Sequence, residues 1–158
     1  MKILLVLALA AALAGCQTPH PFATPDQTWQ THIGQLKYSD AKRTLIGDVV
    51  VQQRGEQEFQ LEFQKAGGIP LLTLRADAEV ARAEGVFARG SWQGAPSAAP
   101  QHLRNWMALR EAFRHPKPLA IKSGDQPWQG EAVSSGGRLR SVTLAFPDEQ
   151  RFVFQFNR

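Results

Sequence analysis

The amino-acid sequence predicts an α+β fold, an antiparallel β half-barrel of about six to eight strands with one or two covering helices. Residues 57–65 alternate strictly between polar and apolar side chains, which is the period of a strand with one buried face. Near the end of the chain, residues 138–146 place Val142, Leu144 and Phe146 on one face, and residues 151–157 place Phe152, Phe154 and Phe156 on one face. Residues 101–114 instead carry apolar side chains at helical spacing, so a helix is expected between two groups of strands.

The first expected element is a short helix over residues 28–36. Trp29, Ile33 and Leu36 recur there at the spacing of one helical face, although Gly34 lowers the helical propensity of the segment.

Strands are expected from residue 43 onward. Residues 43–53 are rich in β-branched side chains, and a turn at residues 54–56 should join them to the strand at 57–65 as an antiparallel hairpin. A third strand is expected over residues 69–75, with Pro70 near its start, where a missing backbone donor is tolerated.

The middle of the chain is less regular. Residues 79–92 predict one or two strands broken at Gly85, with a helix over the first half as the alternative. The helix at 101–114 should end before Pro116, because the residue preceding a proline avoids helical geometry. A short strand over residues 118–121 and a loop over 122–130 are expected before the final hairpin.

The start of the chain has the pattern of an export signal. A basic residue at Lys2 precedes an apolar run at residues 3–12 that is too short to span a bilayer, which needs about 20 apolar residues. The sequence Leu-Ala-Gly-Cys at residues 13–16 then resembles the lipobox of bacterial lipoproteins. In that class the signal peptide is cut off before the cysteine, which becomes the first residue and is acylated. The alternatives are an ordinary cleaved signal or an uncleaved membrane anchor.

This pattern divides the chain into three parts. Residues 1–15 are a lipoprotein signal peptide, residues 16–27 a lipid-anchored, proline-rich tether, and residues 28–158 a single β-rich domain. Gln17 stands where lipoproteins retained in the inner membrane carry Asp, so we expect a lipid-anchored protein of the outer membrane facing the periplasm. His20 is expected to be a solvated residue of the tether.

Composition argues against several functional classes. The net charge is +4, and the Lys and Arg residues are scattered among acids, whereas nucleic-acid binding favours a concentrated basic face. The four histidines have no metal-ligand spacing, and the chain has no P-loop, G-x-S-x-G or H-E-x-x-H motif. Cys16 is the only cysteine, so acylation would leave no thiol for other chemistry. We therefore expect no catalysis, metal or cofactor, and no nucleic-acid partner.

Large apolar side chains are the remaining feature. They either fill an ordinary core or line an apolar cavity that is open at one edge and takes acyl chains such as palmitate. The residues concerned are Phe59, Leu61, Phe63, Leu72, Leu74, Trp106, Phe113, Phe152, Phe154 and Phe156.

Together with the lipobox, three segments resemble the LolB family of outer-membrane lipoproteins, which receive other lipoproteins from the periplasmic carrier LolA. They are the Trp-x-x-His of Trp29 and His32, the glycine-containing loop and apolar strand of residues 66–74, and the Leu-Arg-x-Trp of residues 103–106. The resemblance implies an open β half-barrel under helices, with an acyl-chain cavity and no cofactor. It also implies that the loop before residue 70 contacts membrane or cargo through Ile69 and Pro70.

Two functional hypotheses follow. In the first, the protein binds acyl chains or lipoproteins in an apolar cavity, as a receptor in outer-membrane lipoprotein localisation. Its partners would be membrane lipid, through acylated Cys16, and lipoprotein cargo with its periplasmic carrier. In the second, it is a non-catalytic interaction or accessory module of an envelope complex with a filled core. The hypotheses differ in whether Trp106 packs against the strand that contains Phe152, Phe154 and Phe156. If it does, the first hypothesis loses its cavity and with it its mechanism.

Overall fold

The computed structural model of this chain describes residues 20–114 and 128–157. The predicted signal peptide, Cys16 and the strand expected at residues 118–121 lie outside the described residues, as does most of the loop expected at 122–130.

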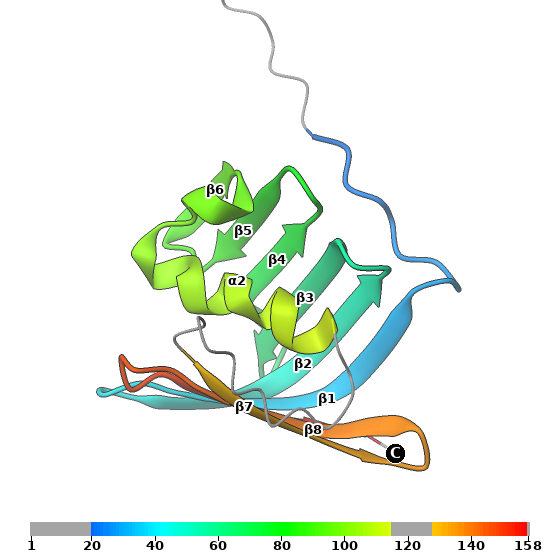
Figure 1. Cartoon of the computed structure of the whole chain (residues 1–158). Coiled ribbons are helices and arrows are strands. Elements are labelled where there is room, and N and C mark those ends of the chain that lie inside the picture. The colour runs from blue at the N-terminus through cyan, green and yellow to red at the C-terminus, as the bar shows by residue number, and fades with distance from the viewer. Residues whose placement is uncertain (1–19, 115–127, 158) are drawn as a thin grey trace, which may run out of the picture.

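The described residues form one open antiparallel sheet of nine strands, in the order β6-β5-β4-β3-β2-β1-β9-β8-β7 (Figure 1). The predicted α+β class and open antiparallel sheet are confirmed, but the sheet has more strands than the predicted six to eight. Consecutive strands pair as hairpins from β1 to β6 and from β7 to β9, and β9 pairs with β1 to join the two groups. The strands are β1 (Gln30–Ser39), β2 (Thr44–Arg54), β3 (Glu58–Lys65), β4 (Ile69–Ala76), β5 (Ala81–Gly85), β6 (Gly90–Gly94), β7 (Gln129–Ser135), β8 (Arg138–Ala145) and β9 (Arg151–Phe156).

The helix predicted over residues 28–36 is wrong, because most of that segment is strand β1. Its side chains alternate in burial, with Leu36 and Tyr38 turned to the core and Gln35 and Lys37 exposed. The alternation is hard to read in the sequence because Gly34 occupies a core-facing position. A Cβ there would lie 2.0 Å from the backbone oxygen of Gln155, so the close approach of β9 requires glycine.

The other predicted strands agree better with the structure. The hairpin of β2 and β3 is confirmed, and the segment around Gly85 forms two strands, so the helical alternative for that segment is wrong. Gln129 and Gly130, expected in a loop, belong to β7. That strand was missed because it is a largely exposed edge strand of mixed polarity, which leaves no clear alternation in the sequence.

The helix predicted over residues 101–114 is α2 (Gln101–Arg114), which follows a short turn of 3₁₀-helix, η1 (Pro96–Ala98). It crosses the concave face of the curved sheet (Figure 1). Arg110 donates hydrogen bonds to the carbonyl oxygens of Gln57 and Asp77, at 3.0 and 2.8 Å, and Arg114 pairs with Glu56 at 3.1 Å. These contacts hold the end of the helix against the β2–β3 and β4–β5 turns.

The sheet has two distinct ends. We call the end with the turns at residues 55–57, 77–80 and 136–137 the tether end, because residues 20–29 reach the start of β1 there (Figure 1). The opposite end, with the turns at residues 40–43 and 66–68 among others, is called the far end. The two ends are about 26 Å apart along an eight-residue strand such as β4, at about 3.3 Å per residue.

The described part of the predicted tether lies against the domain. His20 Nε2 pairs with the carboxylate of Asp77 in the β4–β5 turn, so the expectation that His20 is a solvated linker residue is wrong. Trp29 is buried, and the guanidinium of Arg54 lies 5.4 Å from the centroid of its ring. Contacts with the rest of the described chain therefore begin before residue 28.

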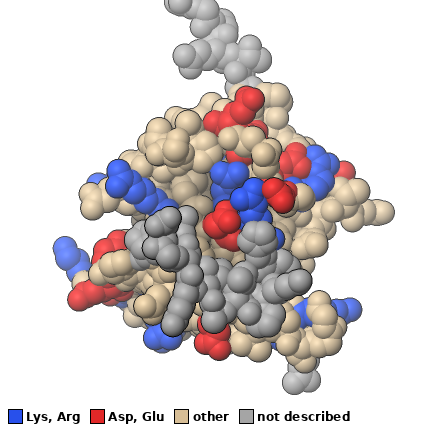
Figure 2. All heavy atoms as spheres, in the orientation of Figure 1, with Lys and Arg blue, Asp and Glu red and all other residues tan. Residues whose placement is uncertain are grey.

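Charges of both signs are interspersed on the face of the molecule shown in Figure 2. Several charges of the described residues are paired locally, including Arg54 with Glu58 and Arg82 with Glu84. On this face the charges do not form one concentrated basic surface.

Candidate functional site

The ten residues predicted to fill a core or line a cavity all lie in one buried cluster. Phe156, the most accessible of them, is 9% exposed. They come from β3, β4, α2 and β9, so the structure does bring together side chains that are distant in the sequence.

The aromatic rings of α2 and β9 pack directly against each other. The rings of Trp106 and Phe152 are 4.7 Å apart between centroids and nearly perpendicular, and those of Phe113 and Phe154 are 5.1 Å apart in the same geometry. Edge-to-face pairs at these distances are typical of a close-packed core. An acyl chain could enter between α2 and this part of the sheet only if the helix moved.

The loop residues singled out by the LolB resemblance lie at the far end. Ile69 is 57% exposed and Pro70 is also exposed, at the first two positions of β4. Ile46 and Val86 are similarly exposed and also lie near this end, on β2 and after β5. Ile69 and Pro70 are thus exposed at the end opposite the tether, with two further exposed aliphatic side chains near the same end.

At the tether end the sheet contains a notch, because β9 is shorter than its two neighbours. The last residue of β9, Phe156, pairs with Gly34 of β1, so residues 30–33 extend beyond it. On the other side, β8 pairs with β9 only from Ser141 onward, so residues 138–139 also extend beyond it.

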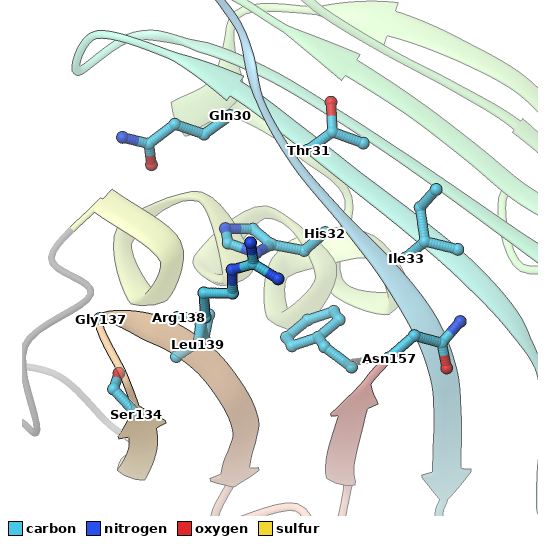
Figure 3. Close-up of a pocket in the computed structure, with 10 residues that line it drawn as sticks. Gln30, Thr31, His32, Ile33, Ser134, Gly137, Arg138, Leu139 and Asn157 are labelled. Atoms are coloured by element: carbon cyan, nitrogen blue, oxygen red, sulfur yellow. The ribbon is translucent and has the colours of Figure 1, made fainter.

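The notch contains a pocket of about 630 Å³, within the usual range for small-molecule sites. We call it the notch pocket. Figure 3 shows its lining residues, which come from the start of β1, the β7–β8 hairpin and the end of β9. Phe156 lines it and also belongs to the apolar cluster, so the pocket adjoins the core. The described lining residues are Gln30, Thr31, His32, Ile33, Ser134, Gly137, Arg138, Leu139, Phe156 and Asn157.

His32 lies between the notch pocket and the core. Its ring is 5.2 Å from that of Phe156 and 6.4 Å from that of Phe113, between centroids. Its Nε2 atom is buried and forms no hydrogen bond within the described part of the chain. Burial lowers the pKa of the imidazole below its usual 6.5, which favours the neutral form.

Folding stability should therefore depend on pH through His32. Because the pKa is lower in the folded state, the unfolded chain takes up a proton more readily as the pH falls below about 6.5, and stability decreases. We expect His32→Gln to flatten this decrease between about pH 7 and pH 5 in urea unfolding experiments, while Thr31→Val keeps the original slope. Equal slopes for His32→Gln and the unchanged protein would contradict the prediction.

Sequence reasoning missed the notch pocket. Arg138 and Ser134 carry no motif, and His32 was considered only as a metal ligand and as part of the LolB resemblance. The Gly136-Gly137 turn was the one visible signal, since it predicts a hairpin ahead of Arg138. The length of β9 relative to β1 and β8, which creates the notch, has no local sequence signature.

Within residues 20–114 and 128–157, no group of three or more His, Cys, Asp and Glu side chains could hold a metal ion. No helix in the same residues is long and apolar enough to cross a bilayer. No protein-family model matches the chain, and no curated protein matches it in sequence.

Proposed function

We propose that this chain is a non-catalytic lipoprotein of the bacterial cell envelope, anchored to the outer membrane through acylated Cys16, that binds acyl chains, either free or carried by other lipoproteins. The observation that carries the proposal is the notch pocket. It is large enough for a small molecule and adjoins the aromatic core through Phe156. It lies at the tether end of the sheet, where His20, four residues after Cys16, pairs with Asp77.

The fold is compatible with this role. The LolB resemblance implies an open half-barrel under helices. The described residues have the open antiparallel sheet, with α2 over it and packed against β9 at Trp106. The proposed site is therefore the notch pocket rather than the space between α2 and the sheet. Phe156 is common to the notch pocket and the predicted cavity residues.

The packing of α2 supports a second candidate function. A filled core with exposed Ile46, Ile69 and Val86 near the far end suits an anchored interaction module of an envelope complex. Such a module would use its surface and would need no acyl-binding site.

Acyl binding can be tested with the mature chain, residues 16–158, carrying Cys16→Ser so that no acyl group is attached. A fluorescent fatty-acid analogue should bind saturably and be displaced by a palmitoylated lipopeptide. Ser134→Trp should weaken binding at least about tenfold, because the indole would occupy the notch pocket from an exposed position.

Ile69→Glu is the matched control, since it changes an exposed residue at the other end of the sheet and should leave affinity unchanged. Circular dichroism establishes that each variant is folded. Absence of saturable binding by the folded protein would overturn the proposal and favour the interaction module. Binding that Ser134→Trp does not affect would place the acyl site outside the notch pocket.

A further inference from the structure

The charge of the notch-pocket lining differs from that of a second cavity at the tether end. The described lining residues of the notch pocket include the cation Arg138 and no carboxylate. The second cavity, of about 490 Å³ between the β2–β3 and β4–β5 turns, shows the opposite pattern, with four carboxylates and one arginine. Of these two cavities, the notch pocket is the one whose charge favours an anion.

Arg138 is held at the mouth of the notch pocket by a tight turn. Gly136 and Gly137 have φ values of 59° and 74°, which allow the two-residue connection between β7 and β8. Arg138 is exposed and pairs with no acid among the described residues, and in the view of Figure 3 its guanidinium overlaps the His32 ring. A guanidinium without a partner can bind a carboxylate or phosphate through two parallel hydrogen bonds.

His32 contributes its imidazole to the lining of the same site. The ring forms no hydrogen bond through its buried Nε2 within the described part of the chain, although buried polar atoms are normally hydrogen-bonded, so it is the pocket-facing part of the ring that a ligand would meet. A ligand oxygen bound by Arg138 could accept a hydrogen bond from this imidazole. The hydroxyl of Ser134, which lines the pocket beside the irregularity in β7, is a further donor.

Apolar groups line the rest of the pocket. Leu139 and Phe156 are 6% and 9% exposed, and Ile33 is 55% exposed at the rim. We infer that the notch pocket binds an anionic acyl lipid, with its carboxylate or phosphate head on Arg138 and His32 and its chain along Leu139 and Phe156. This inference rests on the proposed function and adds the class of lipid bound.

The position of the pocket suits such a ligand. Cys16 precedes His20 by four residues, which span at most about 14 Å when fully extended. His20 pairs with Asp77 at the tether end, where the notch pocket also lies. Acylation of Cys16 would therefore hold this end of the sheet close to the lipid headgroups.

The test compares lipids that share a single acyl chain and differ in the head, using the mature chain with Cys16→Ser. Lysophosphatidylglycerol and palmitate, kept below their critical micelle concentrations, should each bind at least about tenfold more tightly than zwitterionic lysophosphatidylcholine. Arg138→Gln should remove this preference. Arg140→Gln, on the same strand and outside the pocket lining, should keep it.

Each of the other outcomes leads to a different conclusion. Equal affinities for the anionic and zwitterionic lipids would overturn the inference and leave the proposed acyl binding intact. Binding of inorganic phosphate as tightly as lysophosphatidylglycerol would show a site for the anion alone and overturn the lipid assignment. Absence of binding by any acyl probe would overturn the proposed function as well. A preference for palmitate over lysophosphatidylglycerol, or the reverse, would identify the head as carboxylate or phosphate.

Discussion

Replacing Trp106 with alanine should lower the free energy of unfolding by about 3–5 kcal/mol, because it leaves a large cavity in the packed interior. The side chain is 1% exposed, and its ring lies 4.7 Å from that of Phe152, 5.0 Å from that of Phe87 and 5.6 Å from that of Tyr38. It is therefore one of the side chains through which α2 packs against both halves of the sheet. Urea unfolding followed by circular dichroism measures the loss without depending on tryptophan fluorescence.

Trp92→Ala is the matched control, since Trp92 is only partly buried at the edge strand β6. It should cost less than about 2 kcal/mol, in proportion to the smaller apolar area removed from the interior. If Trp106→Ala cost no more than Trp92→Ala, α2 would not be firmly seated in the sheet. The acyl-chain cavity between α2 and β9 would then become the better hypothesis.

Gly34→Ala should destabilise the protein by about 3 kcal/mol or more, which is at the upper end for overpacking. The added methyl group would lie 2.0 Å from the backbone oxygen of Gln155 and 2.7 Å from the Cα atom of Phe156. Because these are backbone atoms, β9 would have to move away from β1. Urea unfolding should show the loss, and the amide of Asn157, which donates to the Ile33 carbonyl at 2.8 Å, should exchange with solvent faster.

Gly130→Ala provides the comparison, because the methyl group there would meet the side chains of Leu144 and Trp128 at 2.7 and 2.9 Å. Side chains can rotate aside, so a loss near 1 kcal/mol is expected. A Gly34→Ala protein as stable as Gly130→Ala would show that β1 and β9 approach less closely than described. The notch pocket, whose shape depends on the end of β9, would need to be reconsidered.

Local pattern was sufficient for much of the fold. The apolar faces of β3, β8 and β9 alternate with period two, and α2 begins and ends at the residues predicted from its apolar spacing and the following proline. These signals depend on side chains a few residues apart. Pairing of β1 with β9 was not predicted, since no local pattern around Gly34 indicates that this segment pairs with the segment around Phe156.

The candidate site was predicted only in part. The ten apolar residues do cluster, but whether they enclose a cavity depends on how closely α2 approaches β9, which residue spacing does not encode. Arg138, Ser134 and His32 share a pocket only because two strands extend beyond a third.

By itself, the sequence determined which segments form one-sided strands and where α2 lies, because the period of apolar side chains is a local property. It also determined the net charge and the position of the only cysteine, on which the lipoprotein hypothesis depends. The tertiary structure alone decided that Trp106 fills the space beneath α2 and that the notch pocket opens at the tether end. The physical reason is that ring packing and relative strand length follow from contacts between segments far apart in the chain.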